Sequence, residues 1–568
     1  MGTLLAACIL PGLIAFNVPP SPTLFNQAAA LGVWGLAMVA LVRLCMRSPG
    51  MAARRSATLQ AALLSLTVTA LLSSAFGALP WPLGLSAAGL LLATLALALC
   101  GAALRPAPAL LAVFFCAWLA AGVCSSAIAL AQVFAPQWID GDWIARSGVA
   151  GRAVGNMRQP NHLATLLLWS AVAVIPLVEL GPLGRSRLRR AVGLALMALM
   201  VLGITLSGSR TGLVGIAVLA LWGALDGRLS RFSRGLLVTA PLLCAASWAL
   251  TAWWASFHEG HAIGAAARIG EGDLSASRFA IWRDTIALIR MQPWLGAGFG
   301  EFNFAWSLTP FPQRPTAFFD HTHNLPLQFA VELGLPLAAL VLGLLGLALW
   351  QAWRRSSAVV GEAGAAHRAA FVMVLLMAVH SQLEYPLWYA HFLLPTALMW
   401  GLCLGAGAPA PSPAGGGVTP RWPLALGVAM MLAAVLVLVD YRRVVVIFSP
   451  PAAAAPLADR ITDGQRSWFF AHHADYAAAT TADRPADALA AFKRAPHHLL
   501  DTRLMIAWAE ALAQSGDVDR ARHLAARLRE FRNPNSVEFF ALCADAAVEP
   551  RPFQCEPPQR LYSWRDFR

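Results

Sequence analysis

Charged residues are scarce in this chain. Asp, Glu, Lys and Arg make up 12% of its 568 residues, whereas soluble globular domains carry roughly 25%. Hydrophobic residues make up 58%. About thirteen apolar stretches approach the length that a helix needs to cross the hydrocarbon core of a bilayer, which is about 20 residues. The composition therefore excludes an ordinary soluble domain and predicts an all-α, polytopic membrane protein with about 12 to 13 transmembrane helices.

Cysteine patterns typical of zinc or redox sites are also lacking. Most of the nine cysteines lie in or beside apolar stretches, where an isolated cysteine behaves as a small hydrophobic residue. Cys543 and Cys555 lie instead in the polar C-terminal tail, and their spacing alone leaves open whether they form a disulfide. The first apolar stretch has no basic segment before it, so we expect a membrane span there and not a signal peptide.

The apolar stretches are separated by loops of very different length. They are residues 3–16, 28–42, 61–79, 83–104, 110–133, 163–180, 191–206, 211–225, 236–254, 325–350, 369–383, 392–404 and 422–439. The pattern predicts four parts. They are N-terminal spans at 1–255, a large loop at 256–323, C-terminal spans at 324–440 with a Pro/Gly-rich linker at 405–419, and a soluble tail at 441–568. Helical spacing in the tail predicts two antiparallel helices that meet near residue 516, faintly similar to a tetratricopeptide hairpin.

The arginines indicate how the chain crosses the membrane. Clusters of arginines follow the second, sixth, eighth and tenth spans, whereas the loops at 77–81 and 384–391 carry no Lys or Arg. The positive-inside rule therefore places the N-terminus in the cytoplasm. The segments expected on the opposite side are residues 134–161, 207–210, 256–323, 384–391 and the tail. Because the positive charge is spread over short loops, the net charge of +13 does not indicate a nucleic-acid partner.

Two polar clusters lie at the exported ends of spans. The first, residues 155–162, contains Arg158 and Gln159. Its cationic and amide groups suit a sugar or phosphate, although the pattern is equally that of an ordinary helix start. The second is Ser-Gly-Ser-Arg-Thr-Gly at 207–212. Its small residues allow close approach to an anion, and Arg210 can donate to phosphate oxygens. The alternative is an arginine that only extends to the membrane interface.

The large loop holds a third group of polar candidates. Arg278 precedes a predicted amphipathic helix that continues to residue 289, and its alternative is a solvated charge. His321 and His323 follow near the end of the loop. A metal site, a general base and simple interfacial polarity all remain open for them. The His-x-His pattern is a poor zinc signature, whereas histidine titrates near neutral pH and suits a base, with Asp320 available to orient a ring.

One further pattern suggests a different enzyme class. Asp140-Gly141-Asp142 matches the Asp-x-Asp by which many glycosyltransferases hold a metal and a sugar nucleotide. The match is short and lies in a segment expected outside the cytoplasm, where sugar nucleotides are absent. We therefore expect a turn at these residues and not a metal site.

These elements together resemble the superfamily of O-antigen ligases and Wzy polymerases. The resemblance rests on the Ser-Gly-Ser-Arg-Thr-Gly turn, on Ser277-Arg278 with Trp282, and on His323-Asn324 followed by Leu327-Gln328 and Glu332-x-Gly334. Arg158 to His162, the turn Glu384 to Trp388 and the soluble tail are similar to the PglL-type protein O-oligosaccharyltransferases within that superfamily.

The resemblance implies a metal-independent, inverting transfer of a glycan, without a cofactor, in a bacterial inner membrane. The donor would be an undecaprenyl-diphosphate-linked oligosaccharide, and the acceptor Ser or Thr of a periplasmic protein such as a pilin. Arg210 and Arg278 would engage the diphosphate, and His323 would activate the acceptor hydroxyl on the periplasmic face. The residues expected to contribute to the substrate sites are Arg158, Gln159, His321, Asn324 and Tyr385.

Other functions remain open at this point. An O-antigen ligase would share the donor but use a lipid A core acceptor, and a Wzy-type polymerase would extend the glycan itself. A lipid or polysaccharide transporter is a different class, and it predicts ionisable groups within spans and duplicated halves. We find neither in the sequence, so glycan transfer to protein is the favoured interpretation.

Overall fold

The computed structural model describes residues 1–45, 49–184, 186–257, 263–264, 266–267, 274–407, 421–544 and 549–568. Helices and turns make up these residues, and no β-strand occurs among them. The prediction of an all-α protein is confirmed. Of the linker expected at 405–419, residues from 408 onward lie outside the described ranges.

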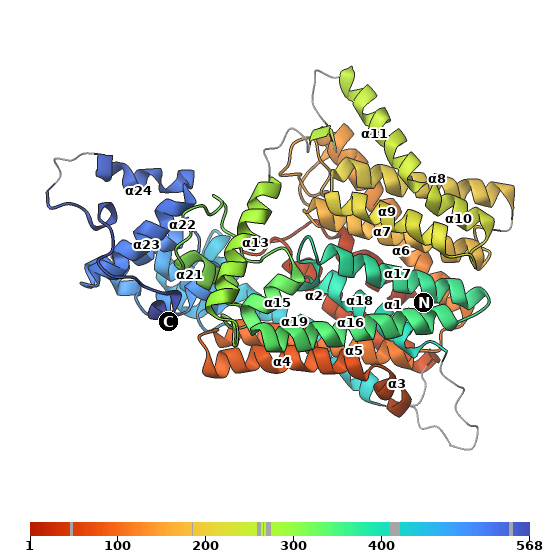
Figure 1. Cartoon of the computed structure of the whole chain (residues 1–568), viewed down its shortest axis with the longest axis horizontal. Coiled ribbons are helices and arrows are strands. Elements are labelled where there is room, and N and C mark those ends of the chain that lie inside the picture. Colours follow the sequence, from red (N-terminus) through yellow and green to blue (C-terminus); the bar gives the residue numbers. More distant parts are fainter. Residues whose placement is uncertain are drawn as a thin grey trace. The chain divides into compact units, whose positions relative to one another are not determined.

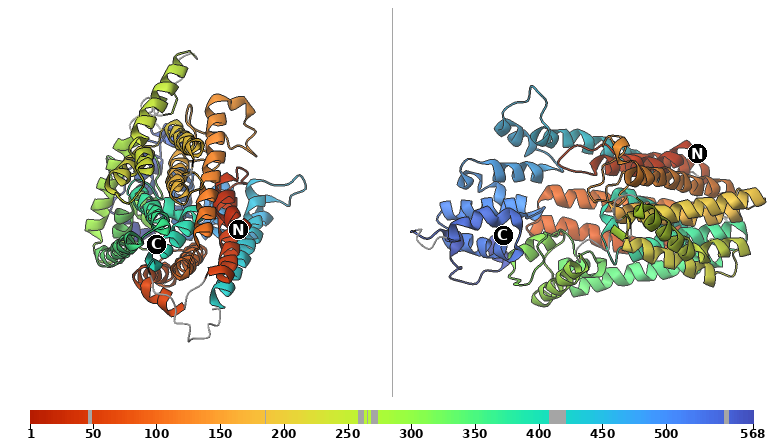
Figure 2. Two further views of the ribbon diagram at one scale, coloured as in Figure 1. Left: turned by 90° about the vertical axis from the view of Figure 1, so that its right-hand side faces the viewer. Right: turned by 90° about the horizontal axis from the view of Figure 1, so that it is seen from above.

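The chain divides into two compact units (Figures 1 and 2). Unit 1 comprises residues 1–63, 92–272 and 343–436. Its helices, whole or in part, are α1 (Gly2–Leu13), α2 (Leu24–Cys45), α3 (Pro49–Arg55), α4 (Ala57–Phe76), α5 (Trp81–Ala103), α6 (Pro108–Phe134), η1 (Pro136–Trp138), α7 (Pro160–Glu179), α8 (Arg187–Ser207), α9 (Arg210–Leu225), α10 (Arg231–Val238), α11 (Ala240–Ser256), α16 (Leu335–Ala358), α17 (Glu362–His380), η2 (Pro386–Trp388), α18 (Ala390–Gly405) and α19 (Trp422–Phe448).

Unit 2 comprises residues 64–91, 273–342 and 437–568. It takes parts of α4, α5, α16 and α19. The elements that it holds whole are α13 (Leu274–Met291), α14 (Phe302–Leu308), α15 (Leu325–Leu333), α20 (Leu457–Gly464), α21 (Ala471–Thr481), η3 (Pro485–Ala488), η4 (Ala491–Lys493), η5 (Ala495–His497), α22 (Thr502–Gln514), α23 (Val518–Phe531), η6 (Pro534–Ser536), α24 (Val537–Ala541), η7 (Leu542–Ala544), η8 (Phe553–Cys555) and η9 (Trp564–Phe567).

Membrane-spanning helices account for most of unit 1. Among the described residues, nine helices are long and apolar enough to cross a bilayer, or ten if the bent pair α10 and α11 is one span. Three shorter apolar helices, α1, α9 and α18, accompany them. Each predicted apolar stretch overlaps at least one of these helices. The protein is therefore a multi-pass membrane protein, and its number of spans remains a prediction.

One predicted span is wrong in its boundary. The stretch 325–350 was expected to be a single helix, but the chain breaks at Gly334 between α15 and α16. Gly334 has φ +76°, and a Cβ there would lie 2.2 Å from the carbonyl oxygen of Trp294. The backbone N–H of Leu335 donates to the carbonyl of Pro293 at 2.7 Å. The close approach of this neighbouring segment requires glycine and ends α15 after nine residues, too few to cross a bilayer.

The tail and the large loop share a hydrophobic core within unit 2. α22 and α23 lie side by side as the predicted antiparallel pair (Figure 1). Their buried residues pack in one cluster with those of α13 and α14. Arg314 of the loop has a fully buried side chain, paired with Glu530 of α23 at 3.1 Å. The tail is therefore packed onto the loop through both apolar contacts and a buried ion pair.

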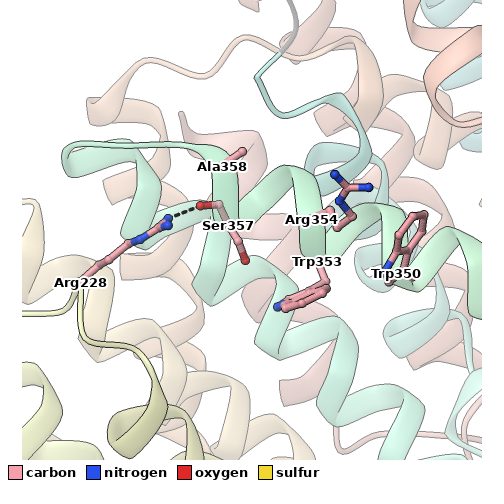
Figure 3. A pocket seen from close by; sticks show the side chains of 6 residues that line it. All are labelled: Arg228, Trp350, Trp353, Arg354, Ser357 and Ala358. Carbon is pink, nitrogen blue, oxygen red and sulfur yellow. Dashed lines mark hydrogen bonds between the residues drawn. The ribbon is translucent and has the colours of Figure 1, made fainter.

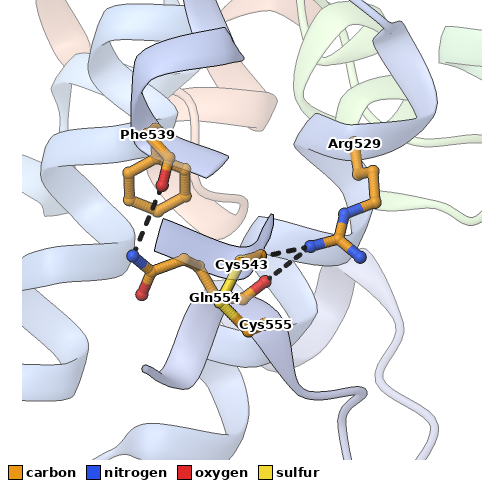
Figure 4. The surroundings of a disulfide bond; sticks show 5 residues. All are labelled: Arg529, Phe539, Cys543, Gln554 and Cys555. Carbon is orange, nitrogen blue, oxygen red and sulfur yellow. Dashed lines mark hydrogen bonds between the residues drawn. A yellow bond between two sulfur atoms is a disulfide. The ribbon is translucent and has the colours of Figure 1, made fainter. Parts of the chain in front are cut away.

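The two tail cysteines form a disulfide. Cys543 and Cys555 are bonded to each other, which settles the alternative left open by their spacing. Arg529 of α23 lies beside the bond, with its guanidinium donating to the carbonyl of Gln554 at 3.0 Å (Figure 4). The disulfide joins η7 to η8, and the hydrogen bond from Arg529 holds η8 against α23.

Arg314→Met is expected to lower the thermal stability of the tail and loop. The change leaves Glu530 without this partner and several buried carbonyls, including that of Trp306, without a donor. Loss of one partner of a buried pair costs about 3–5 kcal/mol. Thermal unfolding in detergent and limited proteolysis of the tail would measure the effect. Arg503→Met, at an exposed arginine of α22, is the matched control, and an equal loss of stability in both variants would contradict the prediction.

Candidate functional site

The side chain of Asn161 connects three segments of unit 1 that are far apart in the sequence. Its Nδ2 donates to Oε1 of Glu384 at 2.7 Å. Its Oδ1 accepts a hydrogen bond from the Ser209 hydroxyl at 2.6 Å. Since Arg210 follows Ser209, and Tyr385 follows Glu384, this one amide gathers both predicted site residues at the start of α7. The sequence alone contained no signal that these three segments meet.

Arg158 and Gln159 lie in the turn that leads into α7. Arg158 has φ +57°, a left-handed conformation that is costly for a residue with a side chain. Gln159 caps the helix, with its Oε1 accepting a hydrogen bond from the backbone N–H of His162 at 2.7 Å. Strain of this kind persists only where surrounding contacts impose it, and it is concentrated at functional sites.

Arg210 stands at the first position of α9, where it is exposed. Its guanidinium has no hydrogen-bond partner among the described residues. The preceding turn is well supported: the Ser209 hydroxyl accepts from the N–H of Gly212 at 3.1 Å, and buried Arg152 donates to the carbonyl of Ser207 at 2.9 Å. Arg210 thus carries a positive charge on a well-supported turn at the N-terminal end of a helix, where backbone N–H groups also favour an anion.

Tyr385 precedes the short helix η2. Its ring lies half-buried beside two other aromatic rings, 6.4 Å from that of Trp388 and 6.2 Å from that of Tyr389. The residue therefore presents a ring surface next to the Asn161 and Glu384 contact. Aromatic surfaces of this kind pack against sugar rings through their apolar faces.

The loop before α15 places His323 in unit 2. His323 has φ +55°. Its imidazole packs in a T-shaped arrangement with the ring of Phe319, with ring centroids 5.4 Å apart. Asn324 caps α15 through a hydrogen bond from the N–H of Leu327 to its Oδ1 at 3.0 Å. Among the described residues three non-glycine residues have positive φ, and His323 and Arg158 are two of them. Both were predicted to be site residues.

Arg278 lies within α13, and not before the helix as predicted. Trp282, one turn later on the same face, donates from its indole N–H to the carbonyl of Thr322 at 2.9 Å. Thr322 stands between His321 and His323 in the loop. The face of α13 that carries Arg278 therefore lies against the loop that contains His321 and His323, which we call the histidine loop.

Asp320 and His321 form an ion pair at 3.1 Å between Oδ1 and Nδ1. Partial burial by itself would raise the pKa of the Asp320 carboxyl, but the imidazoles of His321 and His323 outweigh it and hold that pKa well below its usual range. Asp320 thus stays a carboxylate near neutral pH and can orient the His321 ring.

A buried chain of hydrogen bonds through Gln328 and Glu332 of α15 supports the histidine loop. The N–H of Thr322 donates to Oε1 of Gln328 at 2.8 Å. The amide of Gln328 donates in turn to Oε1 of Glu332 at 2.8 Å. Burial raises the pKa of Glu332 to about 7, although hydrogen bonds from neighbouring backbone N–H groups and from Gln328 oppose the shift. Both residues belong to the motif on which the family resemblance rests, but neither was predicted to be a site residue.

The Asp140-Gly141-Asp142 pattern has a structural role. Asp140 accepts hydrogen bonds to Oδ1 from the N–H groups of three following residues, Asp142, Trp143 and Ile144. The segment is the turn that was predicted.

A hollow of about 450 Å³ lies between Arg228 and the end of α16, where Arg228 donates to the carbonyl of Ser357 (Figure 3). Arg228 and Arg210 flank opposite ends of α9, about 24 Å of helix, so this hollow is not part of the candidate site.

Three family models and one known protein are similar to parts of the chain. A family model described as O-antigen ligase matches residues 195–342, and one described as protein glycosylation ligase matches residues 153–175. A third, described as the C-terminal part of a virulence factor membrane-bound polymerase, matches residues 368–536. The chain is similar to a general O-oligosaccharyltransferase of Acinetobacter baylyi, with 27% identity over 260 residues.

The matched families cover the segments that Asn161 gathers. The chain resembles PglL-type members of the O-antigen ligase and Wzy polymerase superfamily. The aligned region spans 44% of this chain and 43% of the Acinetobacter protein, so the chain matches less than half the length of that relative. Together the matches indicate an enzyme of the glycosyltransferase type.

Glu332→Gln is expected to change how the stability of the protein depends on pH. A folded pKa of about 7 lies above the pKa of the unfolded chain, about 4.3. The folded state therefore binds more protons between these values, and its stability falls as pH rises from about 4.3 to 7. Glutamine does not titrate. From pH 5 to pH 8 the free energy of unfolding of the wild type should fall relative to that of the variant, by up to about 3 kcal/mol. The melting temperature of the variant should therefore exceed that of the wild type increasingly over this range. Parallel melting curves across this range would contradict the prediction.

Proposed function

We propose that this protein transfers a glycan from an undecaprenyl-diphosphate-linked oligosaccharide to serine or threonine hydroxyls of periplasmic proteins. The reaction inverts the anomeric carbon, needs no metal ion, and takes place at the periplasmic face of a bacterial inner membrane. Pilin-like proteins are the expected class of acceptor. The coarser function, glycan transfer, is what the similarity to an O-oligosaccharyltransferase and to the O-antigen ligase family supports.

The observation that carries the proposal is the position of Asn161. It holds the Ser209-Arg210 turn, which resembles the whole superfamily, against the Gln159 and Tyr385 segments, which resemble PglL-type enzymes. The arginine turn that resembles the whole superfamily and two elements similar to protein-modifying members thus lie in one neighbourhood of unit 1.

The chemistry assigns a role to each candidate. The acceptor oxygen forms a bond to C1 of the donor sugar while the bond from C1 to the diphosphate oxygen breaks, and the acceptor proton passes to His323. The leaving group is a di-anion, and Arg210 and Arg278 stabilise its developing charge. Arg158, Gln159 and Tyr385 position glycan or acceptor, whereas His321 and Asn324 orient the histidine loop.

A lipid A core acceptor is the second candidate. The O-antigen ligase family matches residues 195–342, which include Arg210, Arg278 and His323. Donor and leaving group are the same in both reactions, so the acceptor distinguishes them. The Gln159 and Tyr385 segments favour protein.

Arg210→Ala and His323→Ala are each expected to abolish transfer while the protein still inserts into the membrane. Loss of a general base lowers a rate by about 10²–10⁴-fold, and loss of a preorganised charge by about 10²–10³-fold. Transfer would be measured with purified protein, undecaprenyl-diphosphate glycan and chelator present. Arg228→Ala, beyond the other end of α9, is the matched control and should retain activity. Near-normal transfer by either site variant would overturn its assignment.

The acceptor is tested in the same reconstituted system with a pilin-type protein and a lipid A core in parallel. Glycan on the protein is the expected product. Glycan on the lipid alone would assign the chain as an O-antigen ligase, and longer glycan chains without either product would assign a polymerase.

Asn161→Ala is expected to reduce transfer more than Ser209→Ala. The first change removes both hydrogen bonds of the bridge, and the second removes only one of them, although it also removes a helix cap worth about 1 kcal/mol. Rates and melting temperatures of both variants would be measured together. Equal rates, at equal melting temperatures, would show that the bridge does not position the site.

A further inference from the structure

Three histidines of the tail lie together in unit 2, outside the candidate site. His472 and His473 belong to α21, and His498 follows η5, 25 residues later. The ring centroid of His472 lies 4.2 Å from that of His473 and 4.2 Å from that of His498. One nitrogen from each ring is within 4.8 Å of the others. The large sequence separation conceals this cluster from any motif search.

One ring nitrogen of the cluster is buried without a hydrogen-bond partner among the described residues. His472 is 6% exposed, and its Nδ1 has no hydrogen-bond partner among the described residues. An unpaired buried polar atom is costly, and in native proteins it often marks an ion or water that completes the arrangement. Burial and the neighbouring rings lower the pKa of His472, and similar surroundings lower that of His473 to about 3. Neutral imidazole is the form in which histidine binds metals.

The two segments that carry these histidines are held in place on both sides of the cluster. Asp475 of α21 is fully buried and forms a two-point ion pair with Arg494, at 2.6 and 2.7 Å. Tyr476 donates to Oδ2 of Asp501 at 2.9 Å. Since His498 lies between Arg494 and Asp501, its backbone is fixed against α21. Such support of the ligand-bearing segments is typical of built metal sites.

We propose that His472, His473 and His498 bind one Zn²⁺ ion, with water at the fourth position. Imidazole nitrogens alone suit zinc and its neighbours in the transition series rather than Mg²⁺ or Ca²⁺. Zinc–nitrogen bonds of about 2.0–2.1 Å place ligand nitrogens about 3.4 Å apart around a tetrahedral ion, and small side-chain rotations bring the present arrangement to that spacing. His498 is exposed, which gives the ion an entry path.

The ion has a structural role, independent of the proposed glycan transfer. It joins α21 to the segment 494–501, in which the N–H of Leu500 donates to Oδ1 of Asn303 at 2.7 Å, and the Asn303 amide donates in turn to the carbonyl of Phe319. Zinc would therefore stiffen the part of the tail that adjoins the histidine loop.

Zinc titration of protein made without a histidine tag, stripped with chelator and held in detergent, tests this proposal. The wild type should bind one equivalent of Zn²⁺ and melt at a higher temperature when zinc is present. His498→Ala should weaken binding at least ~100-fold and lose the zinc-dependent shift. His473→Ala should do the same. The matched control is His523→Gln in α23, whose ring already bonds to the carbonyl of Leu308, and it should bind as the wild type does.

Two outcomes would overturn the site. One is the absence of zinc binding by the wild type, and the other is unchanged affinity in His498→Ala and His473→Ala. His323→Ala separates this proposal from the catalytic one, because it should lose transfer but keep zinc. Loss of zinc in His323→Ala would place the ligands in the histidine loop and reject the cluster described here.

Discussion

A single amide, that of Asn161, satisfies two polar partners and so joins three segments at one end of the helices of unit 1. Asparagine is suited to this role because it donates and accepts at the same time. Near an apolar interior, each unpaired polar group costs free energy. The requirement to pair Glu384, Ser209 and Asn161 with one another therefore brings their segments together, and the neighbouring Arg210, Gln159 and Tyr385 are carried with them.

Helix starts carry most of the candidate chemistry in both units. Gln159, Ser209 and Asn324 each cap a helix with a side-chain oxygen, and a candidate site residue lies beside each cap. A cap fixes the backbone of the preceding turn, so a charged or basic side chain there is presented from a rigid position. The positive φ values of Arg158 and His323 are the local cost of these turns.

The tail belongs structurally with the large loop. Arg314 is buried against Glu530, and the rings of Phe318 and Phe531 stack at 3.8 Å, so the loop that leads to His323 is braced by residues more than 200 positions later. On the other side of the loop, the buried Glu301 pairs with His497 at 2.8 Å. These contacts explain how a long loop can present a histidine from a fixed position.

The sequence by itself determined the class of the fold, because hydrophobic runs of about 20 residues have one stable solution in a bilayer, the helix. It also indicated Arg210, Arg278, His323, Gln159 and Tyr385, because each lies in a short motif. Only the tertiary structure decided which of them are neighbours, since the contacts of Asn161, of Trp282 with Thr322 and of Arg314 with Glu530 join residues that no local pattern relates. It also decided the break at Gly334 and the cluster of His472, His473 and His498. Both depend on how closely distant segments approach, a property of packing and not of composition.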